Sequence, residues 1–142
     1  DYKYLSWRYD MRPESQYNLF TAWLNNDVVG YIITTSQIRN EGKICFILDV
    51  MADANVAGAV EVLLKSVVDF SIHNNDAMIS ALLMPASIYQ LAFKKFFFVP
   101  LPQKLFPQEI YFGGCQLNHG IAPEIFKKPT SWHISWGDTD LL

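Results

Sequence analysis

Residues 48–64, LDVMADANVAGAVEVLL, join the end of a predicted buried strand to a predicted helix. Residues 43–50 are mostly apolar and have the length of a strand buried on both faces. Asp53 or Asn55 can cap the start of the following helix, and His73-Asn74-Asn75 ends it. Its apolar positions recur every three and four residues: Val56, Ala59, Val60, Leu63, Leu64, Val67 and Phe70. The pattern therefore predicts a strand over 43–50 and a helix over 56–72.

Toward the N-terminus the sequence predicts two further strands. Residues 17–24 alternate apolar and polar side chains, and residues 28–38 are rich in β-branched residues. Asn25-Asn26-Asp27 separates them as a tight turn, and Asn40-Glu41-Gly42 forms the next turn. Three strands joined by short turns form an antiparallel meander.

Toward the C-terminus the period changes again. Residues 77–84 read as a strand, and because a helix precedes it, we expect it to pair parallel with 43–50. A second helix is expected from Pro85 to about Phe97, a proline-containing loop over 99–108, and strands over 109–117 and 132–136. The predicted fold class is α/β (α+β): a mixed, mostly antiparallel central sheet with two main helices, in one domain spanning 1–142.

Composition limits the function. The 142 residues are 51% hydrophobic and 18% charged, which excludes a disordered chain, and the net charge of −3 argues against a nucleic-acid partner. No apolar run is long enough for a membrane span. Cys45 and Cys115 lie in apolar or strand-like surroundings, which suits reduced thiols in a cytoplasmic protein, although a disulfide between them stays open.

The strand-to-helix stretch resembles the signature of the GNAT superfamily of acyl-CoA acyltransferases, Val-x-Pro-x-x-Arg/Gln-x-x-Gly-x-Gly/Ala. Val50 and Gly58 match it, whereas Ala52, Asn55 and Val60 depart from it. In the family, backbone amides at this helix start bind the pyrophosphate of coenzyme A. The resemblance implies that an acyl-CoA contacts the residues Val50, Met51, Asn55, Val56, Ala57, Gly58 and Ala59; an ordinary strand-to-helix turn is the alternative.

A second family element, Tyr-x-x-x-Gly-Phe, falls on residues 93–98. Phe98 matches, Phe97 replaces Gly, and Phe93 replaces the Tyr that many members use as general acid. Tyr89, one helical turn earlier, is either the substitute proton donor or a core residue. Phe93 and Phe97 are expected to pack together at i and i+4. At least one of Phe96, Phe97 and Phe98 is expected to be covered by a second subunit or by protein preceding Asp1.

The two chain ends sharpen the resemblance. Residues 4–9 (YLSWRY) and 132–140 (WHISWGDTD) look like a bacterial, Fem-related GNAT-like subgroup linked to cell-envelope polysaccharide loci. The family's first strand and helices would precede Asp1, as in the C-terminal part of a longer protein.

Asp49 is the predicted general base, because it ends a buried strand where the family places acceptor chemistry; a turn-capping carboxylate is the alternative. Cys115, His119 and His133 lack the spacing of a zinc site or a thiol nucleophile, and Asp138-Thr139-Asp140 lacks further acidic ligands. No metal site is expected.

The predicted function is transfer of an acyl group from acyl-CoA to an amine or hydroxyl of a small molecule, with a sugar precursor as one candidate. The alternative is a GNAT-like binding or assembly module that no longer binds coenzyme A.

Overall fold

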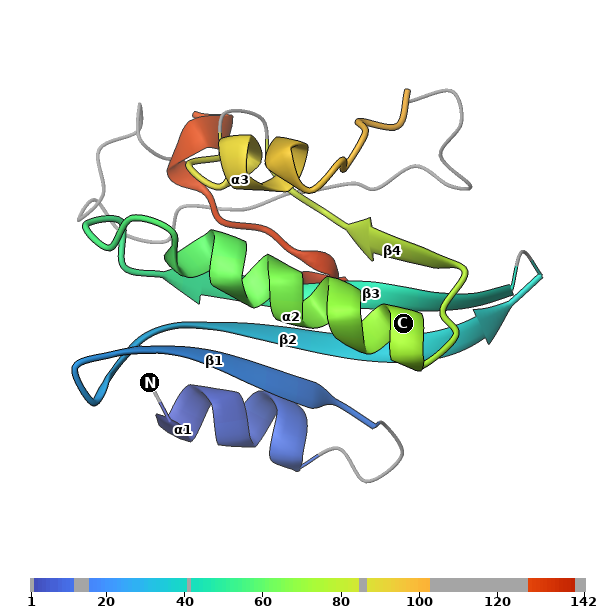
Figure 1. Cartoon of the computed structure of the whole chain (residues 1–142), viewed down its shortest axis with the longest axis horizontal. Helices are drawn as coiled ribbons and strands as arrows, with labels where there is room; N and C mark the ends of the chain where they lie inside the picture. Colours follow the sequence, from blue (N-terminus) through green and yellow to red (C-terminus); the bar gives the residue numbers. More distant parts are fainter. Residues whose placement is uncertain (1, 12–15, 41, 85–86, 103–127, 140–142) are drawn as a thin grey trace, which may run out of the picture.

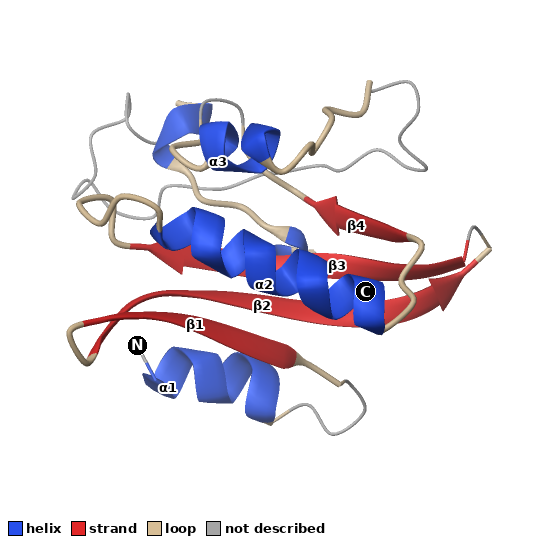
Figure 2. Ribbon diagram, in the orientation of Figure 1, coloured by secondary structure: helices blue, strands red, loops and turns tan. Residues whose placement is uncertain are grey.

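The computed structural model describes residues 2–11, 16–40, 42–84, 87–102 and 128–139. Within them, four strands form one sheet in the order β1-β2-β3-β4 (Figures 1 and 2). They are β1 (Asn18–Leu24), β2 (Asp27–Arg39), β3 (Gly42–Ala52) and β4 (Met78–Ala81). The first three pair antiparallel and β4 pairs parallel with β3, so the predicted mixed sheet is confirmed.

The β1–β2 hairpin closes as its sequence predicts. Leu24 pairs with Asp27, and the two residues between them, Asn25 and Asn26, have φ of 50° and 71°. Positive φ at both central residues defines the type I′ turn, whose twist matches that of the flanking strands, and asparagine tolerates this conformation better than most residues.

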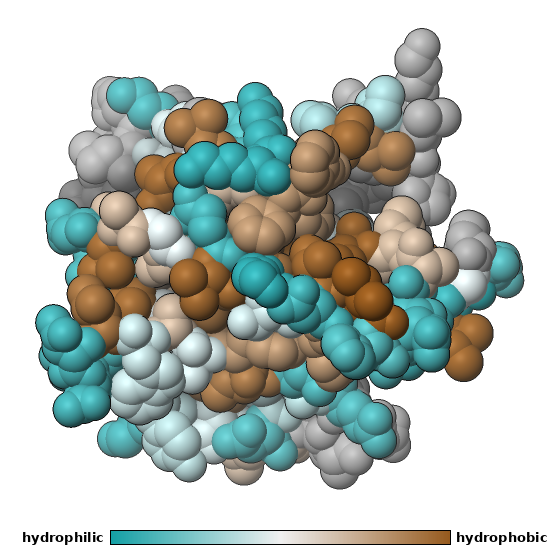
Figure 3. All heavy atoms as spheres, viewed as in Figure 1, coloured by the Kyte–Doolittle hydropathy of each residue, from teal (hydrophilic) through white to brown (hydrophobic). Residues whose placement is uncertain are grey.

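Helix α2 (Ala59–His73) packs on one face of the sheet (Figure 1). Its buried side chains meet those of the strands in one core, which includes Ile32, Ile47, Val50, Leu63, Leu64 and Val67. The exposed side chains of α2 include the Lys65–Asp69 ion pair and the apolar Val62 and Ile72. Figure 3 shows hydrophilic and hydrophobic residues side by side on the face of the molecule that α2 occupies. The helix thus covers the face of β3 that carries Ile47 and Val50.

The start of α2 differs from the prediction. Neither Asp53 nor Asn55 caps the helix; Gly58 is the N-cap, with φ of 83° and no side-chain cap. The Asp53 carboxylate instead accepts hydrogen bonds from Asn55. Residues 53–58 therefore form a separate turn, and the helix begins three residues later than expected.

The other face of the sheet is covered by the two ends of the described chain. Helix α1 (Tyr2–Leu5) continues into the π-helical turn η1 (Ser6–Asp10), and 3-10 turns η3 (Pro129–Ser131) and η4 (Trp136–Asp138) lie near the C-terminus. A second core contains Tyr9, Ile33, Phe46, Leu48 and Trp136. The predicted strand over 132–136 is wrong: the Ser135–Asp138 capping box turns the chain, and the segment crosses the sheet face without pairing.

Helix α3 (Gln90–Lys95) is shorter than the predicted helix over 85–97. It ends in a Schellman motif, in which the amides of Phe97 and Phe98 donate to the carbonyls of Lys94 and Phe93. Phe98 packs against Phe93, with ring centroids 4.9 Å apart, whereas Phe97 is 89% exposed. The expected Phe93–Phe97 packing is therefore wrong, and Phe96 and Phe98 pack against the chain's own core.

Outside the described residues lie the predicted strand over 109–117, residues 103–108 of the predicted loop, Cys115, His119 and Asp140. Cys45 is buried and free. Among the helices in the described ranges, none is long and apolar enough to cross a membrane.

Candidate active site at the end of β3

A β-bulge in β3 sets the direction of Asp49. Ile33 of β2 pairs with Asp49, but the next residue, Thr34, pairs with Ile47, so Leu48 is an extra residue in β3. Leu48 belongs to the core beneath α1 and η4, and the Asp49 side chain hydrogen-bonds Tyr31 on that same face. In a regular strand, adjacent side chains point to opposite faces. The bulge therefore turns Asp49 away from α2 and toward the chain ends.

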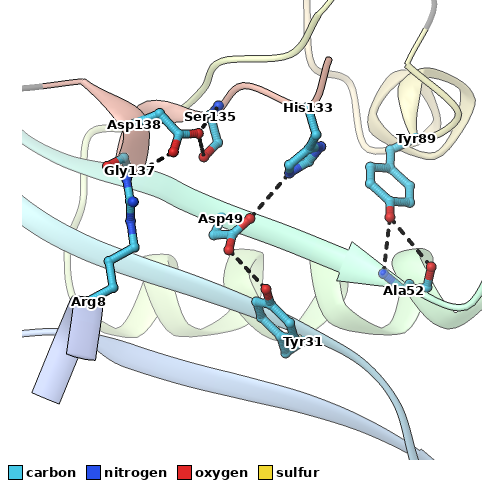
Figure 4. Close-up of polar contacts among 9 residues, drawn as sticks. All are labelled: Arg8, Tyr31, Asp49, Ala52, Tyr89, His133, Ser135, Gly137 and Asp138. Atoms are coloured by element: carbon cyan, nitrogen blue, oxygen red, sulfur yellow. Dashed lines mark hydrogen bonds and ion pairs between the residues drawn. The ribbon is translucent and has the colours of Figure 1, made fainter. Parts of the chain in front are cut away.

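Both oxygens of the Asp49 carboxylate have partners (Figure 4). The Tyr31 hydroxyl donates to Oδ2 at 2.9 Å, and His133 Nε2 lies 3.3 Å from Oδ1. The Asp49 side chain is only 7% exposed. Burial, followed by the charge of Asp49, raises the pKa of Tyr31, so this hydroxyl stays protonated as a donor. Asp49 is thus a buried carboxylate held by two donors.

His133 is the exposed member of this group. Its side chain is 41% exposed and lies between Asp49 and Tyr89, whose ring is edge-on at a centroid distance of 6.3 Å (Figure 4). The hydrogen bond to Asp49 raises the pKa of His133, and burial opposes this shift only in part. On spacing alone His133 is set aside as a ligand or base, and Asp49 is expected to matter in place of His119 and His133. No local motif marks the contact between Asp49 and His133, because 84 positions separate them.

An ion pair between the chain ends holds the His133 segment in place. Arg8 of η1 donates to the Gly137 carbonyl and to Asp138 Oδ1, the latter at 3.0 Å (Figure 4). The other Asp138 oxygen accepts from the amide and hydroxyl of Ser135. Gly137 fits because a Cβ there would lie 2.8 Å from the carbonyl oxygen of Leu48. These contacts hold residues 135–138 against Leu48 at the bulge. The segment begins two positions after His133.

Tyr89, expected to be either a substitute proton donor or a core residue, precedes α3 and belongs to the core that α2 forms with the sheet, against the last residue of β3. Its hydroxyl accepts from the Ala52 amide at 3.1 Å and lies 3.4 Å from the Ala52 carbonyl oxygen (Figure 4). The Ala52 amide therefore points away from β2, and by strand alternation the Val50 amide points the same way. Met51 pairs with Tyr31 of β2. The β4 pairing stops at Ile47, so no described strand pairs with this edge of β3 beyond it.

The residues predicted to contact coenzyme A begin directly after Asp49 in the sequence. Val50 and Met51 lie in β3, the turn contains Asn55, Val56, Ala57 and Gly58, and Ala59 begins α2. The amides of Ala57, Gly58 and Val60 donate to none of the described residues. The Val60 side chain points into the core, and a Cβ on Gly58 would meet no atom within 4 Å. The helix start thus presents unpaired amides to open space, which is the arrangement that attracts an anion.

Two carboxylates lie close to these amides. Asp53 Oδ1 accepts from the amide and side chain of Asn55 at 2.8 and 3.0 Å. Glu61 pairs with Lys95 at 2.8 Å, and this hydrogen bond lowers the pKa of Glu61. A bound anion would therefore be repelled mainly by Asp53. Within the described part of the chain, no cluster of His, Cys, Asp and Glu could hold a metal ion.

The architecture defined here, a mixed α+β sheet with a bulged central strand leading into a helix, is the GNAT acetyltransferase fold. No protein-family model and no curated protein matches the sequence. Solved structures do match. Aminoglycoside N-acetyltransferase AAC(6')-Iy in complex with CoA has a TM-score of 0.60 and 13% identity, over 80% of this chain and 88% of that one.

Two further matches are acetyltransferases. Aminoglycoside acetyltransferase meta-AAC0020, from an uncultured soil metagenomic sample and in complex with sisomicin, has a TM-score of 0.54 and 16% identity, covering 82% of this chain and 74% of that one. Ribosomal-protein-alanine N-acetyltransferase from Brucella melitensis biovar Abortus 2308 has a TM-score of 0.54 and 11% identity, covering 72% and 75%. At these identities the likeness concerns the fold.

Proposed function

We propose that this protein is an acyltransferase that moves an acyl group from an acyl-CoA to an amine or hydroxyl of a small molecule. The observation that carries the proposal is the Asp49–His133 pair, a buried carboxylate hydrogen-bonded to an exposed imidazole near the end of β3, the strand that leads into the turn before α2. The fold likeness to a CoA-bound acetyltransferase supports the same donor. A cytoplasmic, bacterial setting in the Fem-related subgroup is part of the proposal and rests on the chain-end resemblance.

In the proposed donor site, the amides of Ala57, Gly58 and Val60 bind the pyrophosphate, assisted by the dipole of α2. Asn55, Val56 and Ala59 shape the turn around it. The Val50 amide, on the open edge of β3 beside Met51, donates to the thioester carbonyl oxygen. This assignment uses the edge of β3 that faces away from β2, where no described strand pairs with β3 beyond Ile47.

In the proposed chemistry, Asp49 acts through His133. The buried carboxylate orients the imidazole and stabilises its protonated form, while the imidazole takes the acceptor's proton. Tyr89 gives a proton to the leaving thiolate from its position against Ala52. The exposed Phe97 is the remaining candidate contact for a second subunit.

Calorimetric titration with acetyl-CoA, followed by an assay of thiol release with mixed amine and sugar acceptors, tests the proposal. We expect binding by the wild type and a loss of turnover of about 100-fold or more in Asp49→Asn, the size of a general-base contribution. Asp69→Asn, on the exposed face of α2, is the matched control and should keep full turnover. Absence of acetyl-CoA binding, or full turnover in Asp49→Asn, would contradict the proposal.

A further inference from the structure

The Asp49–His133 pair is accessible on one side only. The carboxylate is 7% exposed and both of its oxygens are occupied, whereas the imidazole is 41% exposed. An acceptor approaching this group therefore meets the imidazole of His133 and not a free carboxylate.

The proton arrangement of the pair follows from its partners. An ionised carboxylate only accepts hydrogen bonds, so the His133 nitrogen facing Asp49, Nε2, carries the hydrogen. In the neutral ring Nδ1 then holds the lone pair, and it forms no hydrogen bond with any described residue. His133 thus presents an oriented base to solvent, the arrangement that activates a hydroxyl in Ser-His-Asp enzymes.

The charges around His133 bear on which acceptor fits. The carboxylates that act on His133 are Asp49 and Asp138. Asp138 is neutralised by Arg8 and hydrogen-bonded by Ser135, so neither carboxylate is left to hold an ammonium group. A neutral hydroxyl needs no carboxylate partner, and it needs the base more, because it is a poor nucleophile until its proton is removed.

We infer that the acceptor is a hydroxyl group and that the protein is an O-acyltransferase, with Nδ1 of His133 as the base. This inference rests on the proposed function. The hydroxyl proton moves to Nδ1 as the oxygen bonds to the thioester carbonyl carbon. The C–S bond then breaks, the sulfur receives a proton from Tyr89, and the imidazolium returns its proton through solvent to Tyr89. The products are an ester and free coenzyme A.

Water and a matched pair of small acceptors test this inference without knowledge of the natural substrate. Acetyl-CoA is incubated with the protein in water alone, with ethylene glycol and with ethylenediamine, and thiol release and acetylated products are measured. We expect acetate and the glycol ester above the buffer rate, a loss of about 100-fold in His133→Asn, and no change in His73→Asn. His73 is an exposed residue at the end of α2, which makes it the control.

The outcomes separate the two proposals. Acetylated ethylenediamine, with water and glycol at the buffer rate, overturns the hydroxyl inference and leaves the acyltransferase standing. Ester formation that survives in His133→Asn overturns the assigned base. Binding of acetyl-CoA with no thiol release in any mixture overturns the inference, and absence of binding overturns the proposed function as well.

Discussion

Replacing Phe97 with glycine should stabilise the protein, although it removes a large aromatic side chain. Phe97 occupies the position after the end of α3 with φ of 63°, the left-handed conformation that glycine adopts without a Cβ clash. For other residues this conformation costs about 1–2 kcal/mol. The ring is 89% exposed, so little apolar burial offsets that cost.

The expected magnitude follows from three terms. Relief of the left-handed strain contributes about 1–2 kcal/mol. The greater freedom of glycine in the unfolded chain takes back about 0.4–1 kcal/mol. Loss of the small buried part of the ring takes back roughly a tenth of the ~1.5–3 kcal/mol of a fully buried side chain. The net is a gain of about 0.5 kcal/mol, or a rise in Tm of roughly 1–2 °C for a chain of this size.

Urea unfolding followed by tryptophan fluorescence measures this free energy, with two companion variants. Phe97→Ala keeps the left-handed strain and should show no gain. Phe98→Ala removes a ring packed on Phe93 and should lose about 3 kcal/mol. A loss above about 1 kcal/mol in both Phe97 variants would contradict an exposed Phe97, because it would show that the ring is covered in solution, as by a second subunit.

Three further predictions concern the site. Gly137→Ala should lower the free energy of unfolding, measured by urea titration, by about 1–3 kcal/mol. The reason is that the alanine Cβ would lie 2.7 Å from the Tyr9 hydroxyl oxygen and 2.8 Å from the Leu48 carbonyl oxygen. An unchanged urea midpoint would contradict this packing. Asp53→Asn should tighten calorimetric binding of acetyl-CoA by about threefold to tenfold, because it removes a negative charge beside the proposed pyrophosphate site; weaker binding would place the anion elsewhere. The pKa of His133 is raised by Asp49, so NMR titration should show it falling toward its ordinary value in Asp49→Asn. In the wild type the stabilisation from the Asp49–His133 pair is fully present below the pKa of His133 in the unfolded chain, and it is lost as pH rises through the higher pKa in the folded chain. Base-catalysed turnover should rise over that same pH interval, because the neutral imidazole forms there. A wild-type activity that falls in this interval would contradict His133 as the base.

The sheet could be predicted because its signals are local. Asn25-Asn26 favours a two-residue hairpin turn, and the apolar run over 43–50 has the length and composition of a doubly buried strand. The helix start was harder to place. Val56 continues the helical period, but the left-handed Gly58 and the turn closed by Asp53 take precedence over it.

The site could be predicted only in part. Asp49 stands out as a carboxylate at the end of an apolar strand, yet the direction of its side chain depends on the bulge at Leu48. Strand alternation alone would point Asp49 toward α2. The His133 contact depends on the Arg8–Asp138 ion pair between chain ends 130 positions apart, and periodicity carries no information at that range.

The departures from the GNAT pattern differ in what they affect, and this weighs against reading them together as loss of function. Val60 points its branched side chain into the core, and its amide donates to no residue in the described part of the chain, so Val60 does not block the helix start. Phe97 stands where the pattern has glycine and has a positive φ, so this departure should cost stability. Asn55 is different, because it supplies no positive charge where Asp53 already adds a negative one. Of these departures, Asn55 should therefore weaken the proposed enzyme most, by lowering its affinity for coenzyme A.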